Sequence, residues 1–503
     1  DHHLPNLGVY YASISFSLLI PAVIVFLATG VPDETSTYSL VMATLSGSTW
    51  GVGLALVFWG YKLEEASRAS AIVHTFPVFV AIVAVFWLDE TLVPGQWAAI
   101  IVIVTGAFVI SIRRSDGRAI IRFSRAFPIL VCASMLTALS HLFAKAALDD
   151  AGLTKDDVDG LLTASMSIRN SGLALADYLN MYPKMVDNTT VGGGSFEFHL
   201  SHALNAIAAG RINCPVITYS TLARSGGVSV GTGGVSRFGH PTLDPSPDSF
   251  EELYGLTTVG LYAMIAQRHM HLYGTTSEQL AEIAVATRYH ASMNPEALFR
   301  NPITVEDVVN SRVISSPLHL PDCCVITDGG GAVVVASAEV ARNCRHQPVW
   351  VLGAGEAVAH QGAGKRDLMY IAAHQSHEPA FGMAGVTHQD IDMAMIYDSF
   401  TITVLETLED LGFCKKGEGG DFVSGGRLRI GGELPINTDG GGLSSNHPGM
   451  RGIFLLLEAT RQLRHEFDGT PRQVADCNIA LCHGTGGALG SRHSGGTVIL
   501  GRD

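Results

Sequence analysis

The stretch from Pro435 to Gly452, P-I-N-T-D-G-G-G-L-S-S-N-H-P-G-M-R-G, most constrains what this chain can fold into. Glycine loses backbone entropy on ordering and offers no side chain to pack, so this stretch predicts neither a helix nor a strand interior. It predicts a turn whose free backbone N–H groups face a ligand. His447 and Pro448 precede the apolar pattern M-R-G-I-F-L-L-L-E-A-T-R-Q-L-R-H-E. We therefore expect His447 at a helix N-terminus, a suitable place to hold an oxyanion. A structural turn with a polar histidine is the alternative.

The 503 residues suffice for two or three domains, and their apolar content is unevenly distributed. From Leu7 to about Ala147 the sequence is mostly apolar, with no lysine or arginine before Lys62, whereas the sequence from Asp149 is acidic and rich in glycine. A net charge of −14 without a basic tract argues against nucleic acid as a partner. Eight scattered cysteines without a C-x-x-C pair indicate neither a disulfide framework nor a zinc knuckle, and favour a reducing, cytosolic setting for the acidic part.

Five apolar stretches have the length of a bilayer crossing, at about 8–30, 40–61, 70–88, 97–112 and 127–147. They predict an all-α bundle of about five transmembrane helices. The pattern E-E-A-S-R-A-S-A-I-V-H-T-F-P-V-F-V-A-I-V-A-V-F-W-L-D-E-T-L, followed by G-Q-W-A-A-I-I-V-I-V-T-G-A-F-V-I-S, resembles the EamA-like repeat of drug/metabolite transporters. The resemblance covers about one repeat. It implies that residues 1–148 are a partial, multi-pass membrane domain that does not transport by itself.

Three sequence echoes in the same order predict an internal duplication of alternating strands and helices. They pair D-D-A-G-L-T-K-D-D-V-D-G-L-L-T at 149–163 with A-G-V-T-H-Q-D-I-D-M-A-M-I at 384–396, G-G-G-S-F at 192–196 with G-G-G-L-S at 440–444, and D-G-G-G-A-V-V-V-A-S at 328–337 with H-G-T-G-G-A-L-G-S at 483–491. We expect halves at 149–345 and 346–503. The excess in the first half, about 223–313, is expected to form a loop domain over the active site.

Duplicated α/β halves, each with a glycine turn that feeds a central helix, resemble the thiolase superfamily, and most of all its lipid-transfer, sterol carrier protein-type branch. The resemblance covers residues 149–503 but lacks the family's first strand and half of its first helix. It implies an α/β fold of duplicated αβαβα layers with an inserted loop domain. It also implies a coenzyme A thioester as substrate, no tightly bound cofactor, and a homodimer.

In thiolases a nucleophilic cysteine stands at the N-terminus of the first central helix, where the helix dipole lowers its pKa. Alignment from Val191 places Ser195 at that position, whereas alignment from the end of the helix places Gly193 there. A serine without a base hardly ionises at neutral pH, so Ser195 is either a poor nucleophile or a helix cap. Either alignment leaves the position without a cysteine.

The resemblance carries over further residues. S-N-H-P-G at 445–449 places His447 where the family has the histidine that binds the thioester oxygen, and Cys482-His483-Gly484 overlays the C-x-G turn whose cysteine shuttles protons. I-Y-D-S-F at 396–400 replaces the family's N-E-A-F or H-D-C-F, so Tyr397 beside Asp398 becomes a proton donor or acceptor, or else a packing residue. The glycines expected at the oxyanion or coenzyme A are Gly193, Gly194, Gly441, Gly442 and Gly484. The histidine pairs His269/His271 and His374/His377 lack a third ligand, so no metal is expected.

Claisen thiolysis passes through an acyl-enzyme and needs the cysteine, so its loss argues against that route. Retro-aldol cleavage of a β-hydroxyacyl-CoA needs only a base for the hydroxyl proton and an oxyanion hole for the enolate. Cysteine-less members of this branch include steroid side-chain aldolases that work with a small OB-fold partner. We expect an acyltransferase-superfamily enzyme that makes or breaks a carbon–carbon bond next to a CoA thioester, in the sharper form a retro-aldolase on a bulky lipid or steroid acyl-CoA. The alternative is a transporter remnant with an inactive CoA-ester-binding domain.

The joint between the two parts poses a topology conflict. Five arginines between Arg113 and Arg125 predict a cytoplasmic loop, so a spanning segment at 127–147 would place the thiolase-like part outside, away from cytosolic CoA esters. We expect that part in the cytoplasm. Either 127–147 does not cross the membrane, or two unrelated reading frames were joined near Lys145 to Asp149.

Overall fold

The structure, a computed structural model, describes residues 113–115, 118–120, 146–165, 170–221, 223–224, 257–360, 366–489 and 491–502. The chain divides into two units, Asp1–Leu142 and Phe143–Asp503. In the first unit the arginine-rich loop forms a hairpin of β1 (Arg113–Ser115) and β2 (Arg118–Ile120). The five predicted spans lie outside the described residues, apart from the end of 127–147. Within the described part of the chain, no helix has the length and apolar character that a membrane crossing requires.

The first half of the second unit contains a four-stranded sheet in the order β4-β3-β5-β8. Strand β3 (Gly160–Thr163) runs parallel to β4 (Met185–Asp187) and β5 (Pro215–Thr221), and β8 (Gly329–Val334) runs antiparallel to β5 at the edge. All four residues of β3 are buried, as expected of a parallel strand covered on both faces.

The second half also contains a four-stranded sheet, three strands of which repeat this arrangement. Its sheet has the order β10-β11-β12-β9, with β10 (Met393–Ile396) parallel to β11 (Ile479–Ala488). Strand β12 (Ser491–Gly501) runs antiparallel to β11 on one side and to β9 (Trp350–Ala359) on the other. Strand β12 is thus paired on both edges, whereas its counterpart β8 is paired only with β5 among the described residues. The third sequence echo, which matched 328–337 with 483–491, is therefore wrong, because most of 483–491 lies in β11.

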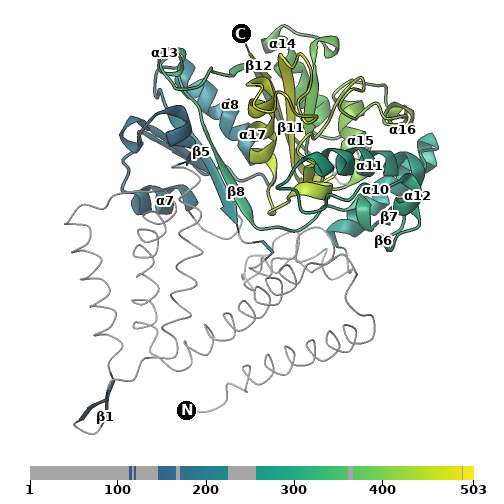
Figure 1. Ribbon diagram of the computed structural model, residues 1–503, viewed down its shortest axis with the longest axis horizontal. Coiled ribbons are helices and arrows are strands. Elements are labelled where there is room, and N and C mark those ends of the chain that lie inside the picture. Colours follow the sequence, from purple (N-terminus) through teal and green to yellow (C-terminus); the bar gives the residue numbers. More distant parts are fainter. Residues whose placement is uncertain are drawn as a thin grey trace. The chain divides into compact units, whose positions relative to one another are not determined.

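Two helices lie between the sheets, α8 (Ser195–Ala208) and α17 (Gly452–Leu463) (Figure 1). Their buried side chains form one core with both sheets, which includes Phe196, Leu200, Ile217, Met395, Leu455 and Leu456. Helix α7 (Ser171–Leu179) packs on β3 and β4, and α14 (Ala373–Ala384) packs on β9 and β12. The predicted succession of α, β, α, β and α layers is therefore present in the second unit.

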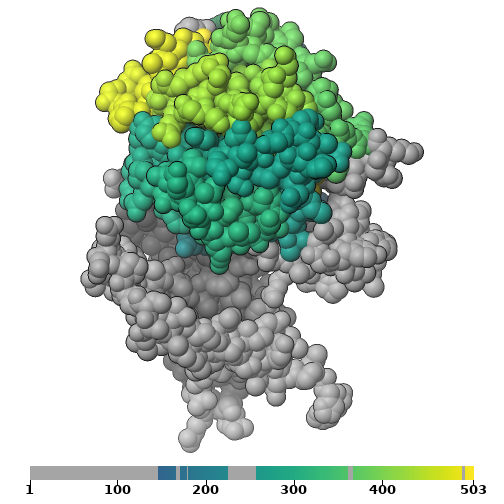
Figure 2. Space-filling view, turned by 90° about the vertical axis from the view of Figure 1, so that its right-hand side faces the viewer, coloured from purple at the N-terminus to yellow at the C-terminus, as the bar shows by residue number. Residues whose placement is uncertain are grey.

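The insertion in the first half lies between β5 and β8. Its described elements are α10 (Thr258–Tyr273), α11 (Ser277–Met293), α12 (Val305–Val309), β6 (Val313–Ser315), β7 (Leu318–His319) and the 3-10 turn η3 (Leu320–Asp322). It shares a second hydrophobic core with α15 (Thr401–Asp410) of the other half, and Figure 2 shows its teal and green surface against the yellow-green surface of that half. Two short helices, α13 (Ala338–Ala341) and α16 (Gly419–Phe422), complete the unit.

Two sequence expectations need correction. The glycine turn of the second half does not lead directly into the central helix, because Gly441–Ser445 forms a separate π-helical turn, η5. Helix α17 begins only at Gly452, so Pro448 is outside it and His447 is not at its N-terminus. The first half differs, since Gly192–Gly194 there run straight into α8.

Candidate active site

The π-helical turn η5 is held by carboxylates on the inner side of its backbone. Gly441 has a φ of 63°, and a side chain there would overlap the carboxylate of Asp398. The N–H groups of Gly442 and Leu443 donate to Asp398 at 2.7 and 3.1 Å, and Gly441 donates to Asp439 at 2.9 Å. The expectation that Gly441 and Gly442 offer free N–H groups to a ligand is therefore wrong, because both groups are occupied within the protein.

Arg451 joins this turn to the start of α17. Its fully buried guanidinium donates to Asp439 at 2.5 and 2.7 Å and lies 3.5 Å from Asp398. It also donates to the side chain and carbonyl oxygens of Asn446 at 2.7 and 2.9 Å. Burial raises the pKa of Asp398 to about 6, although Arg451 opposes the shift. Asp398 thus braces the turn and is not directed at Tyr397.

Tyr397 and His447 form a buried pair. The phenol oxygen of Tyr397 lies 2.9 Å from Nε2 of His447, with the rings nearly perpendicular, and accepts a hydrogen bond from the backbone N–H of Arg451 at 3.3 Å. Burial raises the pKa of Tyr397 well above its usual value, and burial with the nearby Arg451 charge lowers the pKa of His447 to about 3. Both groups are therefore neutral at pH 7. Nδ1 of His447 has no partner among the described residues, so it is available to a ligand.

Gly193 lies directly against the Tyr397 ring of this pair. A side chain on Gly193 would overlap the Tyr397 ring and its hydroxyl, so the tyrosine occupies the space that such a side chain would need. The carbonyl oxygen of Gly193 accepts the N–H of Gly452, the first residue of α17, at 3.0 Å. Within the described residues, the N–H groups of Gly193 and Gly194 have no acceptor, so they remain candidates for an oxyanion.

Ser195 is occupied in its own turn. Its hydroxyl donates to the carbonyl oxygen of Gly192 at 2.6 Å and accepts the N–H of Val191 at 3.0 Å, and the residue is fully buried. The hydroxyl therefore closes the turn that precedes α8. It does not cap the helix, whose N-cap is Gly194 and has no side-chain cap bond, so the cap alternative is wrong. Within the part of the chain that the structure describes, the hydroxyl forms no hydrogen bond with Tyr397 or His447.

The C-x-G turn divides between two faces of β11. The Cys482 thiol donates to the carbonyl oxygen of Leu455 in the core at 3.5 Å, and burial raises its pKa well above the usual value. His483 faces the opposite side, where Nδ1 lies 2.8 Å from the Thr497 hydroxyl. Gly484 does reach the site, because its carbonyl lies against Gly194. The structure therefore gathers Gly193, Gly194, Gly484, Tyr397 and His447, and leaves His483 outside this group.

Sequence reasoning missed three residues of this region. Tyr219 on β5 donates to the carbonyl oxygen of Pro448 at 2.6 Å and accepts the N–H of Met450 at 3.2 Å. Arg451 stood inside the glycine-rich stretch, and a lone arginine beside T-D-G-G-G was a signal for a buried ion pair. Glu197, between Phe196 and Phe198 in an apolar helix start, was a similar signal.

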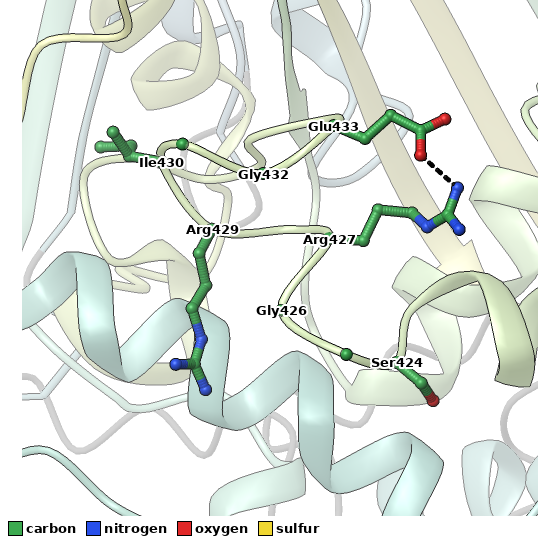
Figure 3. A pocket seen from close by; sticks show the side chains of 9 residues that line it. Ser424, Gly426, Arg427, Arg429, Ile430, Gly432 and Glu433 are labelled. Carbon is green, nitrogen blue, oxygen red and sulfur yellow. Dashed lines mark hydrogen bonds and ion pairs between the residues drawn. The ribbon is translucent and has the colours of Figure 1, made fainter.

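A surface pocket of about 650 Å³ lies in the loop Ser424–Glu433, which leads to the glycine turn (Figure 3). Arg427 pairs with Glu433 at 2.5 Å, whereas Arg429 points away from that pair and lies over the Tyr289 ring of α11. The pocket thus offers one arginine without a carboxylate partner among the described residues. In the same described ranges, no cluster of three or more histidine, cysteine or acidic side chains could hold a metal ion.

Comparison with known proteins assigns the chain to a family. Residues 355–502 match the family model "Thiolase C-terminal domain-like". A "Steroid side-chain-cleaving aldolase" from Thermomonospora curvata is 38% identical over 362 residues, which are 68% of this chain and 88% of that protein. The chain belongs to the thiolase superfamily.

Further relatives include an acetyltransferase and a solved aldolase structure. An "Acetyl-CoA acetyltransferase" from Methanothermobacter thermautotrophicus is 35% identical over 69% of this chain and 90% of that protein. The solved structure described as "Ltp2-ChsH2(DUF35) aldolase" is 34% identical, with a TM-score of 0.62 over 72% of this chain and 91% of that chain. Residues 4–112 match the "EamA-like transporter family". The prediction of a thiolase-superfamily segment joined to an EamA-like segment is confirmed, and the thiolase part is an enzyme of CoA thioesters.

Proposed function

We propose that the thiolase part is a cysteine-independent retro-aldolase that cleaves a bulky β-hydroxyacyl-CoA. One observation carries the proposal. The Tyr397 ring fills the side-chain space at Gly193, so the position that either holds or adjoins the family's nucleophile is taken by a phenol. A phenol can transfer a proton, whereas burial raises the pKa of Tyr397 so far that it hardly ionises to the nucleophile that an acyl-enzyme needs.

The geometry suits this division of roles. The neutral phenol takes the substrate's hydroxyl proton as it passes its own proton to Nε2 of His447, 2.9 Å away. As the carbon–carbon bond breaks, its electron pair becomes the enolate of the CoA fragment. The N–H groups of Gly193 and Gly194 and the unpaired Nδ1 of His447 are the donors for the enolate oxygen.

The loop Ser424–Glu433 is the place we assign to the phosphates of coenzyme A. Arg429 presents a guanidinium without a carboxylate partner in the described part of the chain, and guanidinium groups bind phosphate in a planar, two-point geometry. The same proposal includes four further points. They are the domain boundaries at 148 and 345, a homodimer, a small OB-fold partner, and a membrane location with the thiolase part in the cytoplasm. The EamA-like match supports the membrane segment, and the two names in the description of the related aldolase structure support a partner.

The test is incubation of the full chain with 3-hydroxy-3-methylbutyryl-CoA and with a bulkier tertiary β-hydroxyacyl-CoA. We expect release of a ketone and of acetyl-CoA, without a covalent acyl-enzyme in the mass spectrum of the quenched protein. An acyl group trapped on Ser195 would restore a thiolase or esterase-like route. Binding of both esters without cleavage would favour the inactive CoA-ester-binding alternative.

A further inference from the structure

Glu197 is a buried acid that the proposed function does not yet use. It is the third residue of α8, only 1% exposed, and neither carboxyl oxygen has a hydrogen-bond partner among the described residues. Buried polar side chains are nearly always paired, so an unpaired carboxyl calls for a functional or structural reason. Side chains in the first turn of a helix lean toward its N-terminus, here the end at which Gly193 meets Tyr397.

Three glycines on three different elements leave room for this carboxyl. A side chain at Gly452 of α17 or at Gly484 of β11 would overlap a carboxyl oxygen, and one at Gly496 of β12 would come within 2.6 Å of the Glu197 Cβ. Gly452 is also the residue that donates to Gly193. The carboxyl therefore lies against the glycine backbone that surrounds the Tyr397–His447 pair.

The charges around Glu197 favour its neutral form. From β11 the titratable neighbour is the Cys482 thiol, whereas α17 and β12 present Gly452 and Gly496. His199, two residues along α8, interacts instead with Asp187 and His202. Within the described ranges no cation offsets the burial, which raises the pKa of Glu197 to about 8 although its own backbone N–H opposes the shift. At pH 7 the group holds a proton.

We propose that Glu197 is the acid that completes the cleavage, an inference that rests on the proposed retro-aldol function. The carboxyl O–H bond breaks and its proton forms the new C–H bond at the α-carbon of the CoA enolate. The enolate's electron pair enters that bond. The resulting carboxylate then regains the proton that left the substrate hydroxyl through Tyr397 and His447. One proton thus moves from oxygen to carbon, and no further reactant is needed.

The experiment compares the wild type with Glu197→Gln, which fills the same space but has no acidic proton, in the full chain. The matched control is Glu406→Gln. Glu406 on α15 is also fully buried, also has two unpaired oxygens in the described residues, and also has a raised pKa, but its charged neighbours are Lys416, Asp410 and Glu409. Three measurements are made: the infrared band of protonated carboxyl groups from pH 6 to 9, exchange of the α-protons of acetyl-CoA in D2O, and ketone release.

We expect the wild type to lose a protonated-carboxyl band as pH rises through about 8, and Glu197→Gln to lack that band. Glu197→Gln should reduce α-proton exchange by at least about a hundredfold, within the usual range of a general acid, and Glu406→Gln should leave it unchanged. Tyr397→Phe should block ketone release but retain the exchange. An ionised Glu197 at pH 7, or wild-type exchange in Glu197→Gln, would overturn the inference alone. A wild type that neither cleaves nor exchanges would overturn the proposed function and the inference together.

Discussion

The two halves of the thiolase part share a frame down to single hydrogen bonds. In the first half Asp157 accepts the backbone N–H of Thr154 at 2.8 Å, and in the second half Asp390 accepts that of Thr387 at 2.7 Å. Asp159 then accepts the N–H groups of Asn213 and Cys214, as Asp392 accepts those of Asn478 and Ile479. The duplication therefore preserves the turns that align the strands.

The halves differ in what this frame carries. The second half supplies Tyr397, His447 and the braced turn, whereas the first half supplies the backbone of Gly193 and the carboxyl of Glu197. In the second sheet β9 pairs with β12, whereas in the first sheet β8 has one free edge among the described residues. The comparison teaches that chemistry and strand pairing can change in one copy while the aligning turns stay the same.

The largest expected effect tests whether the second half provides the proton-transfer group. Tyr397→Phe should lower ketone release by about a thousandfold, in the range of a general acid or base. The matched control is Tyr219→Phe, because that first-half phenol holds the same 448–451 segment by similar hydrogen bonds without touching His447. Both variants should lose about 1 kcal/mol of unfolding free energy, measured by denaturant. Equal activity losses would assign Tyr397 a purely structural role.

His447→Ala comes next. Loss of one oxyanion donor should cost about 3–4 kcal/mol of transition-state stabilisation, a few hundredfold in rate, with the fold little changed. Ser195→Ala, the counterpart in the first half, should keep most activity because its hydroxyl serves its own turn. Steady-state kinetics of both variants check this. Activity of His447→Ala within threefold of wild type would remove the histidine from the site.

The free edge of β8 should be visible in hydrogen exchange of the full chain. Alternate amides of Gly329–Val334 that do not donate to β5 should exchange at least about tenfold faster than amides of β12, which is paired on both sides. Mass spectrometry or NMR resolves these segments. Equal protection of β8 and β12 would show that another segment covers β8, and would weaken the hypothesis that two reading frames were joined near Lys145 to Asp149.

Acid should destabilise the second half more than the first. Burial lowers the pKa of His447 and His483 to about 3, and that of His493, His199 and His290 to about 4, and three of these five histidines belong to the second half. A histidine whose pKa is lowered in the folded protein takes up its proton more readily when the protein is unfolded. Its contribution to the free energy of unfolding is therefore complete above about pH 6.5 and is lost as the pH falls toward the folded-state pKa.

Each such histidine changes the unfolding free energy by up to about 1.4 kcal/mol per pH unit. His493→Gln should therefore reduce the slope of the unfolding free energy against pH by the equivalent of one proton between pH 6.5 and 4, measured by denaturant unfolding. The ring nitrogens of His493 have no hydrogen-bond partner of good geometry among the described residues, and the Gly486 backbone opposes the lowering of its pKa only in part. An unaltered slope would show that His493 is protonated in the folded protein.

The smallest effect concerns the second-half loop Ser424–Glu433. Arg429→Ala should raise KM for a CoA ester about fivefold, or about 1 kcal/mol, because one charge-assisted contact to phosphate is lost. KM for the matching pantetheine ester, which lacks these phosphates, should not change. Arg427→Ala is the control, since Glu433 already neutralises that arginine. An equal rise for both esters would place Arg429 outside the phosphate site.

The frame was predictable from the sequence because it depends on local patterns. The echoes D-D-A-G-L-T and A-G-V-T mark the turns that the structure contains, and the glycine turn of the first half marks the start of its central helix. The five-layer α/β fold follows from them. The predicted transmembrane spans lie outside the described residues and stay a prediction.

The site was only partly predictable, because its contacts join distant residues. The overlap of Tyr397 with the space at Gly193 depends on the contact between the residue after β10 and the turn before α8, which no local pattern records. The choice between Gly193 and Ser195 therefore stayed open in the sequence. Likewise, the N–H groups of Gly441 and Gly442 seemed free only because their acceptors, Asp439 and Asp398, come from outside the triple glycine.

The overlap between Gly193 and Tyr397 also restricts how such a protein can evolve. A cysteine introduced at Gly193 alone would collide with the phenol, and a smaller residue at position 397 alone would remove the proton-transfer group without providing a nucleophile. Each single step toward a thiolase passes through an impaired protein, whereas the two changes together restore a compatible pair. The two positions are thus epistatic, and a change from this arrangement to one with a cysteine at position 193 would require both substitutions at once.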